Sequence, residues 1–330
     1  MAEILFNILE QTSTFQIMAI NQLEKIIVNE SEQWIHVRGK NINAPLIIHV
    51  QAGPGLPIIA EANEMQKLLN LEENFLVVYW DQRGTGKSFQ KKADTTKINL
   101  KQMTDDLLVC TNHVLQKYKK DKAIVVGYSI GATISLMAAQ KDSSLFKHLF
   151  LVGTDTDIPF ANKYAADFAI NKAAELNNHK LMKEAAELRK LSITDSKLFQ
   201  RRAKLLTNLG GIKSGTKYSQ LLMATIMSMI RSRQYSFSDI SRTIKGMEFC
   251  QDALIPEMNK LSLFGKIITL DIPVDFIHGK LDGIAPYQRT VEFYESINAP
   301  EKRFTGFDHS AHMPHYEESD KFASLIKSTF

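Results

Sequence analysis

Short apolar runs and helical patterns alternate along the first half of the chain. Runs rich in Val, Ile and aromatic side chains predict buried strands at 34–38, 46–50, 76–80, 123–126 and 148–152. Apolar residues at helical spacing predict helices between them, at 58–71, 100–118 and 132–140. Strands that alternate with helices in this way are typical of a parallel sheet with helices on both faces.

The alternation stops in the middle of the chain. From 155 to 262 the sequence has helical patterns, such as 180–190 and 218–230, and no convincing strand. Strands and helices then alternate again at 273–278, 287–297, 302–307 and 316–328. We therefore expect an α/β core made of residues 1–154 and 263–330, interrupted by a helical lid at 155–262.

Composition excludes several classes of protein. The 330 residues carry 40 Lys+Arg against 36 Asp+Glu, which is too near balance for a polyanion binder, so we expect no nucleic-acid partner. Two cysteines, Cys110 and Cys250, are too few for a disulfide framework and suit a reducing cytoplasm. No apolar run is long enough to span a membrane. Residues 1–20 lack a basic region and a cleavage site, so we expect no signal peptide and a cytoplasmic location.

Charge is unevenly distributed between the two parts. The expected lid has 17 Lys+Arg and 11 Asp+Glu, whereas the rest of the chain has 23 and 25. A positive lid would favour anionic substrates or surfaces. The same charges also suit the solvated faces of surface helices, and we favour this second interpretation.

The strongest chemical signal is Gly127-Tyr128-Ser129-Ile130-Gly131, between the strand at 123–126 and an Ala-rich helix. G-x-S-x-G between a strand and a helix is typical of a nucleophile elbow, a tight turn that exposes a serine and needs small neighbours. The amides at the start of the helix would point toward an oxyanion formed at Ser129. Ser129 is therefore the candidate nucleophile.

A serine nucleophile needs a histidine base, which an acid must orient. Among the three histidines after the last predicted strand, His312 lies in a compact loop before the closing helix, with His309 as the alternative. For the acid, Asp282 follows the strand at 273–278. Asp155 and Asp157 follow the strand at 148–152 and compete for this role, but we favour them as hinge or helix-capping residues.

Backbone donors for the oxyanion are expected at two positions. One is the amide of Ile130, the residue after the nucleophile. The other is the amide of Gly53, in the loop Gln51-Ala52-Gly53-Pro54-Gly55, where no side chain would obstruct the acyl group.

Five segments together resemble the proline iminopeptidase-like branch of the α/β-hydrolase family. They are QAGPG at 51–55, DQRGTGKS at 81–88, GYSIG at 127–131, HGKLDGIAP at 278–286 and HSAHMPHYEE at 309–318. The resemblance implies an eight-stranded, mostly parallel sheet with an inserted helical lid. It also implies a triad of Ser129, Asp282 and His312, with Gly53 and Ile130 as oxyanion donors.

Two departures from the family's motifs concern the substrate. Gln51 and Ala52 replace a His-Gly pair beside the oxyanion loop, and Tyr128 and Ile130 flank the serine where proline iminopeptidases usually have G-G-S-W-G. No lid motif places the carboxylates that hold a substrate's free amine in those enzymes. We therefore expect the fold and the triad to carry over, but not the aminopeptidase substrate.

The walls of the substrate site are the least defined part of the prediction. Gln51 and Tyr128 lie next to the catalytic motifs and are candidate substrate contacts. The run from 221 to 230 is too continuously apolar for a helix with a solvated face, so we expect it to bury most of its surface. If it covers the active site, Met223 or Met227 would contact an apolar acyl group. Ordinary packing of the lid on the core is the alternative, and we favour it slightly.

Cofactor motifs do not fit. The stretch from Asp81 to Ser88 ends in Gly-Lys-Ser, but a phosphate-binding loop needs glycine where Asp81 stands. We expect Asp81 and Arg83 to tie this stretch to the Gly53 loop. The sequence has no dinucleotide fingerprint after the first strand, no H-E-x-x-H and no cysteine pair at ligand spacing, so we expect no cofactor and no metal.

The sequence therefore predicts a serine hydrolase. It would cleave an ester or amide bond of a small molecule or short peptide through an acyl-enzyme intermediate. The alternatives are a proline iminopeptidase-type aminopeptidase and a hydrolase fold that binds a ligand without turnover. No oligomeric state is indicated.

Overall fold

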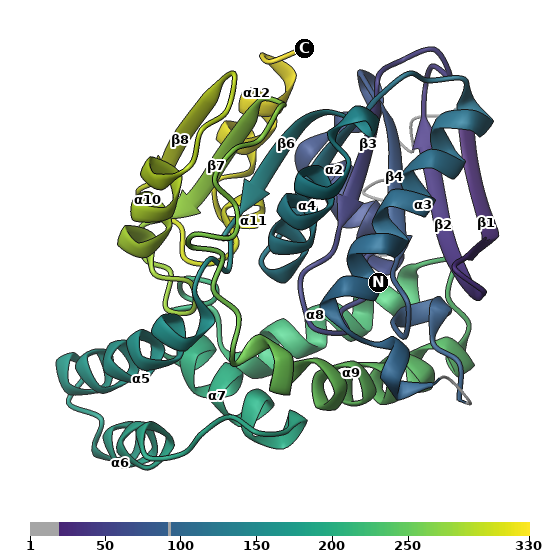
Figure 1. Ribbon diagram of the computed structural model, residues 1–330. Helices are drawn as coiled ribbons and strands as arrows, with labels where there is room; N and C mark the ends of the chain where they lie inside the picture. The colour runs from purple at the N-terminus through teal and green to yellow at the C-terminus, as the bar shows by residue number, and fades with distance from the viewer. Residues whose placement is uncertain (1–19, 92–93) are drawn as a thin grey trace, which may run out of the picture.

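A computed structural model describes residues 20–91 and 94–330 of the chain. Its centre is an eight-stranded sheet with the order β1-β2-β4-β3-β5-β6-β7-β8 (Figure 1). The strands are β1 (Ile20–Val28), β2 (Ser31–Gly39), β3 (Leu46–Val50), β4 (Leu76–Asp81), β5 (Ala123–Tyr128), β6 (Phe146–Val152), β7 (Val274–Gly279) and β8 (Lys302–Phe307). β2 pairs antiparallel with both β1 and β4, and all other neighbours are parallel. The prediction of a mostly parallel sheet is confirmed.

Two layers of helices cover this sheet. The helices of the core are α2 (Ala62–Leu69), α3 (Leu100–Tyr118), α4 (Ile130–Lys141), α10 (Tyr287–Ser296), α11 (Pro314–Glu317) and α12 (Ser319–Lys327). The apolar core of one face includes side chains of α3, α4 and α10, and that of the other includes side chains of α2 and α12. Successive residues of β4 and β5 alternate between these cores, because side chains of a strand point to opposite faces in turn.

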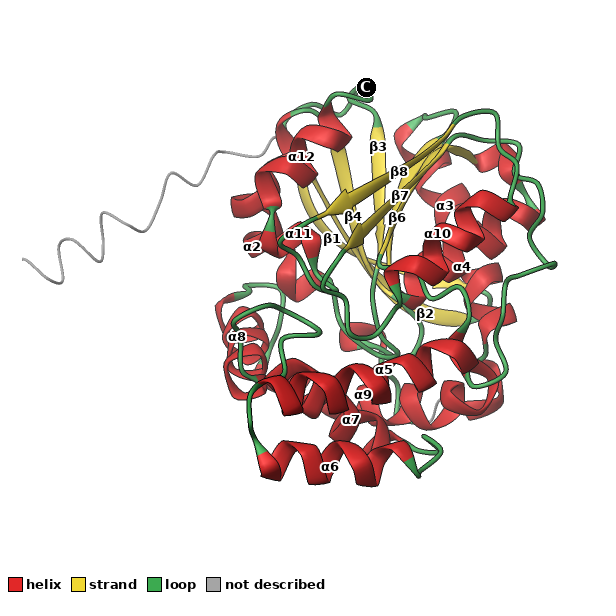
Figure 2. Cartoon of the chain, turned by 90° about the vertical axis from the view of Figure 1, so that its left-hand side faces the viewer, coloured by secondary structure: helices red, strands yellow, loops and turns green. Residues whose placement is uncertain are grey.

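Between β6 and β7 the chain forms helices. They are α5 (Ile158–Glu175), α6 (His179–Arg189), α7 (Ser196–Asn208), α8 (Tyr218–Arg231) and α9 (Phe237–Met258), which we call the helical insertion. Figures 1 and 2 show it as a layer across the end of the sheet toward which β6 and β7 point. α5, α6 and α7 share a small core of their own, with several alanines that allow close packing. The helical insertion therefore covers the edge of the sheet where the predicted catalytic loops lie.

Some elements differ from the sequence prediction. β1 was not predicted, because four of its nine residues are polar and five are exposed, so it has no continuous apolar run. α9 continues through Pro256, although a proline usually kinks or ends a helix. The predicted closing helix is divided into α11 and α12. The predictions for residues 1–19 lie outside the described residues.

The stretch after β4 is anchored differently from the prediction. The carboxylate of Asp81 accepts hydrogen bonds from the amides of Ile58 and Ile59 at 2.9 and 3.1 Å, which joins it to the segment after the Gly53 loop and not to the loop itself. Arg83 does not contribute to this link. Its guanidinium instead donates to both carboxylate oxygens of Asp106 on α3, at 2.7 and 2.8 Å. This part of the prediction was wrong because the partner comes from a helix with no visible motif.

No helix of the described part of the chain is long and apolar enough to cross a membrane.

Candidate active site

Ser129 occupies a sharp turn between the end of β5 and the start of α4. Its φ of 53° and ψ of −122° are strained for a residue with a side chain. The turn requires small neighbours: a Cβ on Gly127 would lie 2.7 Å from the Cα of Ala132, and one on Gly131 would lie 2.3 Å from the carbonyl oxygen of Gln51. The geometry is that of a nucleophile elbow.

The hydroxyl of Ser129 is held by a carboxylate. Its Oγ donates to Oδ2 of Asp155 at 3.0 Å, and the residue is almost completely buried. Ser129 and His312 line the same cavity, but they share no hydrogen bond in the described structure. Reaching His312 therefore requires the hydroxyl to rotate away from Asp155.

His312 is paired with Asp282 as the sequence suggested. Its Nδ1 lies 2.7 Å from Oδ2 of Asp282. The backbone of the His312 loop is also fixed, because its amide donates to the carbonyl of Ile212 at 3.0 Å. Gly153, at the end of β6, lies against the ring, and a Cβ there would come within 3.0 Å of the imidazole.

Burial by itself lowers the pKa of His312, but the nearby charge and hydrogen bond of Asp282 outweigh it. The negative charge of Asp155 acts in the same direction, so the pKa of His312 is raised above its usual value. An imidazole in this setting is a stronger base than a free one, as general-base catalysis requires.

Asp282 is buried and well supplied with hydrogen-bond donors. Oδ1 accepts from the amides of Ile284 and Ala285 at 2.8 and 2.9 Å, and Nε2 of His278 lies 3.2 Å from Oδ2. Burial by itself raises the pKa of Asp282, but the attraction of His312 and the hydrogen bonds from both histidines lower it below its usual range. The carboxylate is thus held ionised beside the imidazole.

The other candidates are placed elsewhere. His309 is exposed, and its amide donates to Glu318. Asp157 caps α5 by accepting from the amide of Phe160, and it forms an ion pair with Arg289 on α10. Asp157 therefore has the capping role that the sequence suggested. Asp155 is different, since it lies against Ser129.

Of the two expected oxyanion donors, Gly53 lies at the cavity and Ile130 directly follows Ser129. Gly53 lines it, and a Cβ at this position would lie 2.6 Å from the amide nitrogen of Gly55. Ile130 is the first residue of α4, where backbone amides have no partner within the helix. Within the described part of the chain, neither amide donates a hydrogen bond. Both are available to a bound oxygen.

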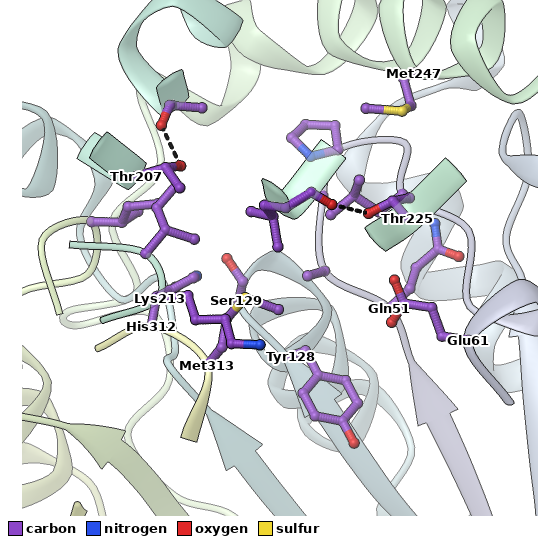
Figure 3. Close-up of a pocket in the computed structure, with 18 of the residues that line it drawn as sticks. Gln51, Glu61, Tyr128, Ser129, Thr207, Lys213, Thr225, Met247, His312 and Met313 are labelled. Carbon is purple, nitrogen blue, oxygen red and sulfur yellow. Dashed lines mark hydrogen bonds between the residues drawn. The ribbon is translucent and has the colours of Figure 1, made fainter. Parts of the chain in front are cut away.

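The cavity above Ser129 has a volume of about 530 Å³. In Figure 3, Ser129 lies at its centre, with His312, Met313 and Lys213 on one side and Gln51 and Glu61 on the other. The helical insertion forms its roof. A cavity of this size suits a small molecule or a short peptide.

Three of the four predicted substrate contacts line this cavity. Gln51 is anchored by Thr85, whose hydroxyl donates to its Oε1 at 3.3 Å. The hydroxyl of Tyr128 points below the cavity and bonds Nδ1 of His49 at 2.9 Å (Figure 3). Met227 is the third. Met223 does not line the cavity and is 57% exposed.

The orientation of α8 explains the difference between the two methionines. Leu221, Thr225 and Ser228 face the cavity at helical spacing, which places Met223 on the opposite side of the helix. Leu222 and Ile230 are also exposed. The expectation that this run buries most of its surface was therefore wrong.

Several charged residues of the cavity were not predicted from the sequence, among them Glu61 and Arg202. Glu61 precedes α2, and Arg202 comes from α7 of the helical insertion. Burial raises the pKa of Glu61 to about 7, although the hydroxyl of Tyr316 donates to it at 2.6 Å. Neither residue lies in a recognisable motif, and only the three-dimensional fold brings them to the cavity.

Metal-binding residues are not gathered at the site. Across residues 20–91 and 94–330, no group of three or more His, Cys, Asp or Glu side chains could hold a metal ion.

Comparison with known proteins agrees with this architecture. The alpha/beta hydrolase fold family matches residues 45–319. A probable aminopeptidase of Bacillus subtilis is 27% identical over 308 residues, which cover 92% of this chain and 94% of that protein. Among solved structures, a proline iminopeptidase-related protein of Thermus thermophilus superimposes with a TM-score of 0.63 at 16% identity, covering 93% and 96% of the two chains. An esterase of Exiguobacterium antarcticum gives a TM-score of 0.59 at 19% identity, covering 93% and 99%.

Proposed function

Because the chain belongs to the alpha/beta hydrolase fold family, we propose that it is a serine hydrolase acting on an ester or amide bond of a small substrate. Ser129 Oγ attacks the carbonyl carbon while Nε2 of His312 takes its proton. Asp282 orients the imidazole and stabilises its positive charge. The amides of Gly53 and Ile130 bind the oxyanion. The tetrahedral intermediate collapses to an acyl-enzyme, and His312 returns the proton to the leaving oxygen or nitrogen. Water then hydrolyses the acyl-enzyme by the same steps.

The observation that carries this proposal is the convergence at the cavity. A strained serine, two amides without a partner and a histidine–carboxylate pair come together from the four loops that follow β3, β5, β7 and β8, and Gly53, Ser129 and His312 line one cavity. Strain at a non-glycine residue persists only where the surrounding structure supports it, and such residues cluster at functional sites. A protein that only bound a ligand would not need this combination.

The hydrogen bond from Ser129 to Asp155 describes the enzyme without substrate. Rotation about the Cα–Cβ bond moves Oγ from Asp155 to His312, and catalytic hydrogen bonds often form only once a substrate is bound. Asp155 then remains beside the imidazole as a second negative charge.

An aminopeptidase is the second candidate, and Glu61 favours it. Its carboxyl group lines the cavity on the side of Ser129 away from His312 (Figure 3), and no Lys, Arg or His of the described residues forms an ion pair with it. A protonated amine placed there would stabilise the ionised form of the Glu61 carboxyl, whose pKa burial raises. The resemblance to the probable aminopeptidase of B. subtilis points the same way.

A covalent probe tests the nucleophile. A fluorophosphonate should label the wild-type protein and fail to label Ser129→Ala. Ser135→Ala is the matched control: its hydroxyl is bonded to the carbonyl of Gly131 inside α4, so labelling should persist. Labelling of Ser129→Ala at the wild-type level would refute the assignment.

A substrate panel separates the candidate functions. Short 4-nitrophenyl esters are assayed beside the 4-nitroanilides of proline and alanine. A hydrolase with an esterase preference turns over the esters, whereas an aminopeptidase favours the anilides and loses this preference in Glu61→Gln. A protein that binds without turnover would release no nitrophenol in the steady state.

A further inference from the structure

Arg202 is a positively charged residue of the helical insertion, and the charge of Asp155, which bonds Ser129, acts on it. It projects from α7 into the cavity that Ser129 and His312 line. Nη1 donates to Oδ1 of Asn162, and the Cζ lies 5.3 Å from the centre of the Phe199 ring. Burial lowers the pKa of Arg202 to about 10, which leaves it positively charged at neutral pH.

The buried arginines of the core are paired, and Arg202 is not. Arg83 binds both oxygens of Asp106, and Arg38 lies 3.8 Å from a carboxylate oxygen of Glu72. Among the described residues, no carboxylate oxygen lies within 4.0 Å of a nitrogen of Arg202. A guanidinium that lines a cavity and has no carboxylate partner can bind an anion that enters the cavity.

Asp155 does not fill this role. Its charge acts on Arg202 from a distance, but its side chain accepts the hydroxyl of Ser129. Arg202 has five N–H donors and uses one of them within the described structure, for Asn162. The remaining donors have no hydrogen-bond partner among the described residues, and Arg202 lines the cavity in which a substrate would lie.

We propose that Arg202 binds a carboxylate of the substrate, so that the bond cleaved at Ser129 belongs to a molecule with a carboxylate nearby. The cleavage at Ser129 in this inference rests on the proposed function, whereas the binding of a carboxylate by Arg202 does not. A guanidinium presents two parallel N–H groups that match the two oxygens of a carboxylate. A doubly charged phosphate fits less well, because Asp155 and Glu61 already bring negative charge to the same cavity.

The other cations of the cavity are less suited. The Nζ of Lys213 lies 5.3 Å from the centre of the Tyr316 ring and acts on the charge of Glu61. Arg231, at the end of α8, is exposed to solvent, which weakens its interactions. Arg202 is less exposed than Arg231, and the charge of Asp155 acts on it directly.

Two pairs of esters test the proposal and locate the carboxylate. On the acyl side, the 4-nitrophenyl monoester of glutarate is compared with 4-nitrophenyl pentanoate. On the leaving-group side, 4-acetoxybenzoate is compared with its methyl ester. In Arg202→Gln, the ratio of kcat/KM for the anionic member to that for the neutral member should fall about 10- to 100-fold in one pair, as expected for loss of a charge-assisted hydrogen-bonded pair. Arg202→Lys, which keeps the charge but not the fork, should give a smaller fall.

Arg201→Gln is the matched control. Arg201 is the neighbour of Arg202 on α7, but it points outward to Glu184 and Glu187, at 3.5 and 2.9 Å. In Arg201→Gln, the ratio of kcat/KM for the anionic ester to that for the neutral ester should stay within about twofold of wild type, since exposed ion pairs contribute little. An unchanged ratio in Arg202→Gln for both pairs would overturn the proposal, because a structural role affects anionic and neutral esters alike.

Binding without turnover separates this proposal from the proposed function. Glutarate is titrated into Ser129→Ala by calorimetry, with and without Arg202→Gln. Binding that is lost with Arg202 supports the carboxylate site even if no ester is hydrolysed by the wild type. Binding that is absent from Ser129→Ala, or unchanged by loss of Arg202, refutes the site even if Ser129 proves to be the nucleophile.

Discussion

The loops after β6 and β7 each carry a buried aspartate close to His312, but they hold the two carboxylates differently. Asp282, after β7, accepts two backbone amides and lies within hydrogen-bond distance of two histidines. Asp155, after β6, accepts one hydroxyl, that of Ser129. Both residues are more than nine-tenths buried.

The pKa values of these carboxyls shift in opposite directions as a result. Burial raises both pKa values. For Asp282 the attraction and hydrogen bonds of the histidines reverse this effect. For Asp155 burial prevails over the attraction of His312 and the hydrogen bond of Ser129. Burial therefore does not decide the charge of a carboxyl by itself; the number and charge of its donors do.

The largest expected effect is the loss of kcat in Asp282→Asn. An amide cannot stabilise the imidazolium, and it holds the wrong tautomer, so kcat for 4-nitrophenyl acetate should fall roughly 10³- to 10⁴-fold. Asp155→Asn should lose about tenfold or less, because Asn can still accept the Ser129 hydroxyl while His312 keeps Asp282. A larger loss in Asp155→Asn than in Asp282→Asn would reassign the acid to the loop after β6.

The comparison also shows what sequence patterns can reveal. Asp282 and His312 were predicted because each follows a recognisable strand, and the nucleophile elbow combines a strand, two glycines and a helix in five residues. Most strands of the sheet were predicted because their residues are continuously apolar. β1 was missed because polar and apolar residues are mixed along this partly exposed edge strand, which therefore lacks a continuous apolar run.

The remaining site residues depend on tertiary structure. Asp155 was seen as a rival acid or a capping residue, but its contact with Ser129 depends on where the end of β6 lies relative to the elbow. Glu61 and Arg202 reach the cavity from elements more than 100 residues apart. Met223 and Met227 lie in one apolar run, and only the rotation of α8 decides which of them faces the cavity.

A smaller effect is expected in the pH dependence of kcat/KM. His312 must be neutral to accept the proton of Ser129, so activity falls as the pH drops through its raised pKa. Asp155 contributes to that rise by stabilising the imidazolium. In Asp155→Asn the acid limb should therefore move to lower pH. Asp157→Asn, which removes a carboxylate that pairs with Arg289, should leave the limb in place. A limb that stays fixed in Asp155→Asn would show that this charge does not act on His312.

The smallest expected effect is on stability, where the two aspartates should act with opposite sign. The pKa of Asp282 is lowered on folding, so its ionised form stabilises the fold above the unfolded value of about 3.9, and this stability is lost as the pH falls through the folded pKa. The pKa of Asp155 is raised, so its ionisation above that same value opposes folding.

At pH 7.5, Asp282→Asn should lower Tm by roughly 4–8 °C, and Asp155→Asn should raise it by about 2 °C. Thermal unfolding followed by circular dichroism at pH 7.5 measures both changes, with Asp157→Asn as the control for a less buried aspartate. A lower Tm in Asp155→Asn would mean that its carboxylate is stabilised in the fold by more than the hydroxyl of Ser129.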